Sequence, residues 1–105
     1  MNTTKPYSIE EIKEILYSIF IKMPIQKAIL FGSYAKNMPT QKSDVDIYID
    51  SEGALTGLKF FALIDMIQEK LNKDVDVIEK LEVEEDSPIQ KEIEDTGVVI
   101  YERKR

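Results

Sequence analysis

The sequence predicts an α/β (α+β) fold in which a single mixed β-sheet of about four strands is packed with helices. Apolar residues recur at helical spacing over two long stretches, 8–22 and 55–71. Short apolar runs with turn residues at their ends lie between and after these stretches. The expected order is helix, strand, short helix, strand, helix, strand, helix, strand, which favours one mixed sheet covered by helices.

The first helix and the first strand have clear boundary signals. Ser8 opens an S-x-x-E capping-box pattern, and Pro24 closes the helix that is expected over 8–22. The apolar run over 26–31 is the first expected strand. A glycine–serine pair breaks this strand, and a short helix is expected to start at 34–36.

The second strand shows the clearest alternation. It follows a polar loop over 37–43 and spans 44–50, with polar and apolar residues on opposite faces. The polar face carries Asp44, Asp46 and Tyr48, and the apolar face carries Val45, Ile47 and Ile49. A helix over 55–71 follows, and its apolar stripe is expected to face the core. This stripe consists of Leu58, Phe61, Ile64, Ile67 and Leu71.

The remaining elements are shorter. A third strand is expected over 75–78, followed by an acidic, loop-like segment over 79–86, of which the acidic run over 82–86 is expected to be a solvated loop. A serine–proline pair then opens a short helix that Gly97 ends, and residues 98–101 form the last expected strand. The basic end of the chain, Arg103-Lys104-Arg105, is expected to be frayed.

Composition limits the chemistry that the chain can perform. A length of 105 residues supports one domain, taken as residues 1–105. The sequence has no cysteine, which excludes disulfides, thiolate zinc sites and a cysteine nucleophile. It also has no histidine, the commonest general base, so carboxylates, hydroxyls, lysines and backbone groups must carry any reaction.

Charge and hydropathy indicate a cytoplasmic location and disfavour nucleic acid as a partner. The net charge is −6, and the only arginines are Arg103 and Arg105, so polyanion binding is disfavoured while a basic protein partner is permitted. No apolar run approaches the ~18 residues of a membrane span. The first residues lack the basic-then-apolar order of a signal peptide, so we expect a protein of the cytoplasm without a membrane partner.

Aspartates in the middle of strands are the strongest functional signal, because strands favour β-branched and aromatic residues. Asp44 and Asp46 lie on one face, roughly 6.6 Å apart at ~3.3 Å per residue. Asp76 interrupts the third strand in the same way, and Asp74 shares its face. Two carboxylates so placed repel each other unless a cation lies between them. A site made of carboxylate oxygens, without nitrogen or sulfur ligands, fits Mg²⁺. The alternative is an edge strand whose aspartates face water.

A glycine–serine turn precedes these aspartates. Gly32 and Ser33 follow the first strand, where glycine permits close approach to a ligand and the serine hydroxyl and following amides can hold phosphate oxygens. Lys36, one turn later, can add a positive charge. Taken alone, the same pair also fits a plain connection between a strand and a helix.

Together, the two segments resemble a known signature. Gly32-Ser33-Tyr34-Ala35-Lys36, a loop, and Ser43-Asp44-Val45-Asp46-Ile47 resemble the motif G-S-x-A-[RK] followed by S-D-[apolar]-D-[apolar]. The chain is similar in this respect to the DNA polymerase β-like nucleotidyltransferase superfamily, and closest to its minimal members. The resemblance covers almost the whole chain, including Asp76 and the final strand, and implies the palm fold of that superfamily.

The resemblance implies a role for each motif residue. The residues of the nucleotide site would be Gly32, Ser33, Lys36 and Ser43, with ATP as the bound nucleotide. The catalytic and metal-binding carboxylates would be Asp44, Asp46 and Asp76, with Asp74 as the alternative to Asp76. These carboxylates would hold two Mg²⁺ ions, and the third would also help to deprotonate the attacking hydroxyl.

The same resemblance implies an activity and a partner. Minimal members transfer AMP from ATP to a hydroxyl, and many of them silence an RNA-cleaving toxin, a helical HEPN protein, by adenylylating one of its tyrosines. Two other functions stay open: a non-catalytic antitoxin that neutralises its HEPN partner by contact, and a small-molecule transferase of the aminoglycoside type, which the short chain disfavours. A homodimer, formed through an exposed final strand, and a hetero-oligomer both stay open as assemblies.

Overall fold

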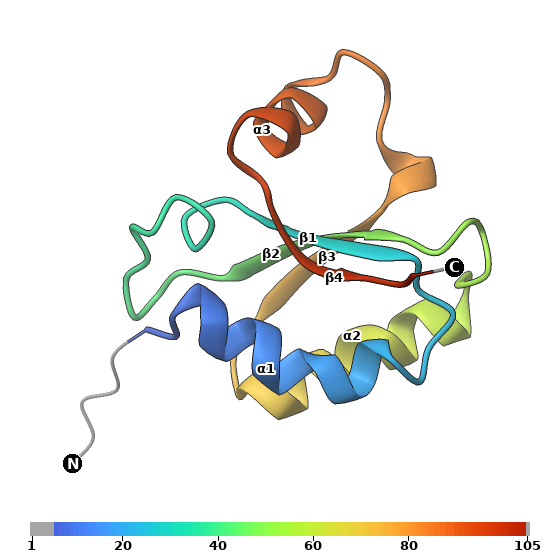
Figure 1. Ribbon diagram of the computed structural model, residues 1–105, viewed down its shortest axis with the longest axis horizontal. Coiled ribbons are helices and arrows are strands. Elements are labelled where there is room, and N and C mark those ends of the chain that lie inside the picture. The colour runs from blue at the N-terminus through green and yellow to red at the C-terminus, as the bar shows by residue number, and fades with distance from the viewer. Residues whose placement is uncertain (1–5, 105) are drawn as a thin grey trace.

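The structure, a computed structural model, describes residues 6–104, which form four strands and three α-helices (Figure 1). In chain order the elements are α1 (Ile9–Phe20), β1 (Lys27–Phe31), β2 (Val45–Asp50), α2 (Leu58–Leu71), β3 (Val75–Glu79), the 3-10 helix η1 (Lys80–Glu82), α3 (Pro88–Thr96) and β4 (Val98–Glu102). In this part of the chain, no helix is long and apolar enough to cross a membrane.

The four strands form one mixed sheet in the order β3-β2-β1-β4. β1 pairs antiparallel with both β2 and β4, whereas β2 and β3 run parallel. A parallel pair requires a crossover connection, and α2 supplies it. The predicted fold class, a single mixed sheet packed with helices, is therefore confirmed.

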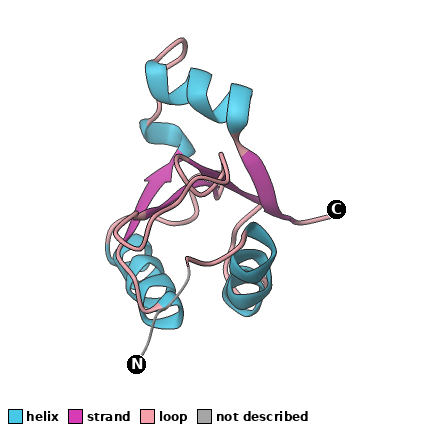
Figure 2. Ribbon diagram, turned by 90° about the vertical axis from the view of Figure 1, so that its left-hand side faces the viewer, coloured by secondary structure: helices cyan, strands magenta, loops and turns pink. Residues whose placement is uncertain are grey.

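Helices cover both faces of the sheet. α1 and α2 lie on one face and α3 lies on the other, as the two views show (Figures 1 and 2). Val45, Ile47 and Ile49 of β2 are fully buried in the core together with residues of α1 and α2. Asp46 and Tyr48 point to the opposite face and are only half-buried. The alternation of β2 is thus confirmed, and it leaves polar side chains accessible on the face of α3.

The helix-end signals in the sequence are confirmed. The Ser8 hydroxyl accepts a hydrogen bond from the N–H of Glu11, whose carboxylate accepts one from the N–H of Ser8. At the start of α3, the hydroxyl of Ser87 accepts a hydrogen bond from the N–H of Gln90. Gly97 follows the last residue of α3 and separates it from β4. These caps satisfy N–H groups that a helix leaves without partners at its start.

Two segments that were expected to be helical are not. The residues over 34–36 belong to a single turn, in which the N–H of Lys36 donates to the carbonyl of Gly32 at 3.1 Å. This turn does not propagate, because Asn37 takes the left-handed backbone conformation, with φ of 59°. Similarly, α2 begins at Leu58 and not at residue 55, since Gly57 has a positive φ of 57° and belongs to the preceding loop.

The predicted apolar stripe of α2 is partly wrong. Leu58 is 86% exposed and Phe61 is 63% exposed, although both were expected to face the core. The buried residues of this helix are Leu63, Ile67 and Leu71. Apolar residues surround the first turns of α2, so their spacing did not define which side of the helix meets the sheet.

The C-terminal segment is anchored, contrary to the frayed end that was expected. The guanidinium of Arg103 donates hydrogen bonds to the carbonyls of Met23 at 2.8 Å, Ile25 at 3.1 Å and Ile21 at 3.3 Å. These carbonyls lie just after α1, where a positive charge also interacts favourably with the helix dipole. Arg105 lies outside the described residues.

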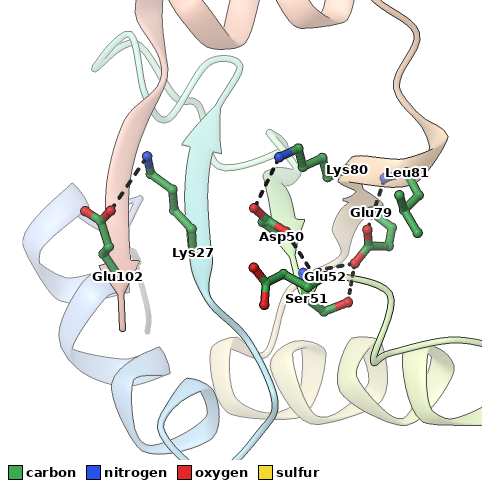
Figure 3. Close-up of polar contacts among 8 residues, drawn as sticks. All are labelled: Lys27, Asp50, Ser51, Glu52, Glu79, Lys80, Leu81 and Glu102. Atoms are coloured by element: carbon green, nitrogen blue, oxygen red, sulfur yellow. Dashed lines mark hydrogen bonds and ion pairs between the residues drawn. The ribbon is translucent and has the colours of Figure 1, made fainter. Parts of the chain in front are cut away.

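Polar contacts fix β2 and β3 at the ends where both strands leave the sheet (Figure 3). The buried carboxylate of Glu79 accepts hydrogen bonds from the hydroxyl of Ser51, from its N–H at 3.2 Å, and from the N–H of Leu81 at 3.1 Å. Lys80 forms an ion pair with Asp50 at 3.5 Å nearby. These contacts tie the two strands together at one end, and their other end carries the candidate site.

Candidate active site

Two aspartates lie side by side on neighbouring strands. The parallel register of β2 and β3 aligns Asp46 with Asp76. Partners in register project to the same face of a sheet. Because the alternating Val45, Ile47 and Ile49 of β2 face the core under α1 and α2, Asp46 and Asp76 project to the other face, which α3 covers (Figure 2). Asp46 is half-buried, whereas Asp76 and Asp44, the residue before β2, are exposed. The sheet thus presents adjacent carboxylates from two strands close to solvent.

The surroundings of Asp46 disfavour its charged form. Burial, followed by the negative charges of Asp76, Asp44 and Glu92, raises the pKa of Asp46 from 3.8 to about 6. Asp46 therefore lies close enough to three other carboxylates for their charges to act on it. A bound cation would remove this repulsion and favour the charged form of Asp46.

Gly32 lies directly against the carboxylate of Asp46. The antiparallel register pairs Phe31, the last residue of β1, with Asp46, so the next residue of the chain reaches the aspartate side chain. A Cβ atom at Gly32 would overlap with the Oδ2 atom of Asp46. Gly32 also has φ of +77°, a conformation that other residues rarely adopt. The glycine–serine turn and the aspartates therefore belong to one site.

Lys36 lies near this site but is paired. Its Nζ atom is 3.5 Å from Oε2 of Glu92 in α3, and the charge of Glu92 acts on Asp46 as well. Ser33 is half-buried in the same turn, one residue after Gly32. The structure thus brings the turn, its lysine and the acidic strand close together.

Ser43 holds the loop before β2. Its hydroxyl accepts a hydrogen bond from the N–H of Thr40 at 2.9 Å and lies 3.3 Å from the Thr40 hydroxyl. This contact shapes the chain where it enters β2, next to Asp44. The geometry gives Ser43 a role in the loop, and its binding of nucleotide stays a prediction.

Asp76, and not Asp74, is the neighbour of Asp46. Asp74 precedes β3, where its carbonyl accepts a hydrogen bond from the N–H of Val45 at 3.3 Å, and its charge is not among those that shift the pKa of Asp46. Across residues 6–104, no three acidic side chains are already grouped as ligands of one metal ion. The Asp46–Asp76 pair still fits Mg²⁺, because this ion is usually held by one or two carboxylates together with substrate phosphates.

Glu92 is a residue of this site that sequence reasoning missed. It lies on α3, far along the chain from the motifs, and its side chain joins Lys36 to the acidic cluster only through folding. Glu92 is one of several acidic residues in a charged helix, so nothing in the local pattern set it apart.

A mixed sheet that presents adjacent aspartates beside a glycine–serine turn defines a protein of the nucleotidyltransferase class. The family described as polymerase beta, nucleotidyltransferase, matches residues 10–105. The chain therefore belongs to the polymerase beta nucleotidyltransferase family, and it is a nucleotidyltransferase. The motif-based resemblance is confirmed at the level of the family.

Relatives with curated names occur in Methanocaldococcus jannaschii. One is named "Putative protein adenylyltransferase MJ0128"; it is 38% identical over 77 residues, which cover 70% of this chain and 79% of that protein. A second, named "Putative protein adenylyltransferase MJ0435", is 35% identical over 71 residues, which cover 68% of this chain and 76% of that protein.

Solved structures with a similar fold include chains of toxin–antitoxin complexes. A chain in a crystal structure of a toxin–antitoxin with AMP-PNP gives a TM-score of 0.72 at 19% identity, over 87% of this chain and 73% of that chain. A structure of a tri-AMPylated Shewanella oneidensis HEPN toxin in complex with an MNT antitoxin gives a TM-score of 0.67 at 17% identity, over 90% of this chain and 73% of that chain. At these identities the likeness establishes the fold.

Proposed function

We propose that the domain formed by residues 1–105 transfers AMP from ATP to a hydroxyl group of a protein, in a reaction that depends on Mg²⁺. One observation carries the proposal. Gly32 lies against the carboxylate of Asp46, and Asp76 lies in register beside it, so a phosphate-binding turn and a pair of metal-binding carboxylates form a single site.

Each motif residue has a part in this proposal. Gly32 and Ser33 hold the triphosphate, because glycine permits close approach of a ligand and the Ser33 hydroxyl and the amides of the turn can donate hydrogen bonds to phosphate oxygens. The carboxylates of Asp44, Asp46 and Asp76 hold two Mg²⁺ ions. When bound, Mg²⁺ offsets the charge of the phosphates and lowers the pKa of an attacking hydroxyl.

Other residues complete the nucleotide site. The exposed carboxylate of Asp76 accepts the proton of the hydroxyl, because the chain has no histidine to do so. Lys36 exchanges Glu92 for a phosphate oxygen when ATP binds, and Ser43 contributes its hydroxyl beside Asp44.

A protein acceptor is the part of the proposal that the comparisons support. Relatives of similar length are named protein adenylyltransferases, and chains of similar fold occur in complexes of an MNT antitoxin with an AMPylated HEPN toxin. We therefore propose a tyrosine of a helical HEPN toxin as the acceptor, which makes this chain an antitoxin. Such a pair would act in the cytoplasm, where ATP is available.

Transfer of labelled AMP tests the proposal. The purified chain is incubated with Mg²⁺, the product of the neighbouring gene, and ATP labelled at either the α- or the γ-phosphate. We expect label on the protein acceptor from α-labelled ATP only, and its loss in the variants Asp46→Asn and Asp76→Asn. Asp65→Asn is the matched control, because Asp65 is exposed on α2, on the other side of the sheet. Absence of label with ATP, GTP, CTP and UTP alike would contradict the proposal.

Neutralisation by contact alone is the competing explanation. It is tested by growth of cells that carry the partner together with a double variant, Asp44→Asn with Asp46→Asn. We expect this variant to lose its protection of the cells, because the reaction needs both carboxylates. Protection that persists without label transfer would assign the chain to a non-catalytic antitoxin.

A further inference from the structure

A carboxylate of α3 occupies the positive charge of the glycine–serine turn. The Nζ atom of Lys36, which belongs to this turn, lies 3.5 Å from Oε2 of Glu92. Lys36 is the basic residue of the motif, and both side chains of the pair are partly exposed to solvent. A phosphate that approaches the turn therefore has to share Lys36 with Glu92 or displace Glu92 from it.

The packing of α3 fixes where this carboxylate lies. Ile93, the residue after Glu92, is buried. A Cβ atom at Gly97, directly after the helix, would overlap with the side chain of Ile29 in β1. The helix thus lies close against the strand that leads into the glycine–serine turn, on the face of the sheet that α3 covers (Figure 2). Glu92 reaches Lys36 from a packed helix, so the fold holds a negative charge at the turn.

The field around Asp46 is negative. The charges that shift its pKa all come from carboxylates, those of Asp76, Asp44 and Glu92, and together with burial they raise it to about 6. Repulsion between like charges is screened less where the groups are partly buried than where they are fully in water. A triphosphate that enters without a cation therefore adds its own negative charge to a cluster that already repels it.

We propose that Glu92 is a specificity-determining residue, which makes the site bind a triphosphate that carries a divalent cation in preference to the metal-free form. The inference rests on the proposed function and names the form in which the nucleotide binds. A metal-free triphosphate carries more negative charge than one that holds Mg²⁺, so Glu92 repels it more strongly. Glu92 also competes with it for Lys36. A cation held between the phosphates and the aspartates offsets this repulsion.

Such a preference has a use in the proposed reaction. Transfer needs the divalent cation, so a metal-free nucleotide would occupy the site without reacting. Specificity against an unwanted ligand commonly comes from a repulsive group and not only from added contacts to the wanted one. Glu92 supplies such a group beside the turn, at a position that the motif does not include.

Binding of AMP-PNP, measured by calorimetry with Mg²⁺ and separately with EDTA, tests the inference. Removing one negative charge in Glu92→Gln should strengthen metal-free binding about three- to tenfold and change binding with Mg²⁺ less than about twofold. Glu94→Gln is the matched control, because it is the same replacement at an exposed position of α3 whose charge does not act on Asp46. An equal change under both conditions, or no change under either, would overturn the inference.

Two further probes separate a charge effect from a structural one. In NMR titrations without Mg²⁺, Glu92→Gln should strengthen the binding of inorganic tripolyphosphate as it does that of AMP-PNP. It should not change the response to adenosine, which has no phosphate. An equal change for adenosine and tripolyphosphate would show that the variant disturbs the packing of α3, and would refute the role of the charge.

These binding measurements involve no transfer, so they are decided separately from the labelling experiment. A loss of metal preference in Glu92→Gln, together with an absence of label, would support the inference and contradict the proposed reaction. Label transfer with an unchanged metal preference would overturn the inference alone. A wild-type protein that binds neither form of AMP-PNP would overturn both.

Discussion

Replacing Gly32 by alanine tests the junction between the turn and the aspartates. The alanine Cβ would occupy space that the Oδ2 atom of Asp46 now fills, and the backbone would have to keep φ of +77°. The left-handed conformation costs a non-glycine residue ~1–2 kcal/mol. For a domain of this size, that cost lowers the melting temperature by roughly 5–15 °C. Displacing the Asp46 carboxylate by ~1 Å should in addition lower the rate of AMP transfer about 100-fold.

Gly53→Ala is the matched control for this variant. Gly53 has a similar positive φ of +81°, and a Cβ atom there would meet only Cδ1 of Leu81 at an ordinary 3.7 Å. We expect Gly53→Ala to lose a similar amount of stability and to keep its transfer rate. Thermal melts followed by circular dichroism and label transfer well below both melting temperatures separate the two effects. Equal transfer rates in the two variants would refute the placement of Gly32 against a catalytic carboxylate.

Three further predictions concern the rest of the structure. Asp46→Asn should raise the melting temperature at pH 8 but not at pH 4. Burial and neighbouring carboxylates raise the pKa of Asp46 from 3.8 to about 6. The wild type therefore loses stability as the pH rises between these two values. An equal effect at both pH values would contradict this. Arg103→Ala should cost ~1–3 kcal/mol in the free energy of unfolding, because several carbonyls lose a charged donor. The control Lys104→Ala, at an exposed position, should cost less than ~0.5 kcal/mol. Equal costs would refute the anchoring of the C-terminal segment by Arg103. Leu63→Ala should cost ~2–5 kcal/mol in denaturant unfolding, whereas Leu58→Ala should cost less than ~0.5 kcal/mol. The reverse order would show that Leu58 faces the core, as the sequence pattern had predicted.

The alternation in β2 was predictable because its signal is local. Buried valine and isoleucines alternate with polar residues along the strand, and one side of the sheet faces α1 and α2. The motif also pointed to Gly32. Its contact with Asp46 could not be read from the sequence, because that contact depends on the antiparallel register of β1 and β2. The alignment of Asp46 with Asp76 likewise depends on how the α2 crossover sets β3 beside β2.

Errors arose where long-range contacts decided the outcome. In α2, apolar residues surround the first turns, so Leu58 and Phe61 were assigned to the core although the sheet meets another side of the helix. Arg103 was read as part of a frayed basic end, because its carbonyl partners near Met23 lie at the other end of the chain. The role of Glu92 depends on packing of α3 over the sheet, which its sequence does not encode locally.

The proposed reaction requires Asp46 and Asp76 to bind a divalent cation beside a triphosphate held at Gly32. Paramagnetic broadening by Mn²⁺ tests it most directly, with the isotope-labelled protein, saturating AMP-PNP and substoichiometric Mn²⁺. We expect the amide signals of Gly32, Asp46 and Asp76 to broaden first, and the variant Asp46→Asn to lose this effect. Broadening centred on the acidic segment over 82–86, with the Gly32 signal left sharp, would contradict cation binding at Asp46 and Asp76.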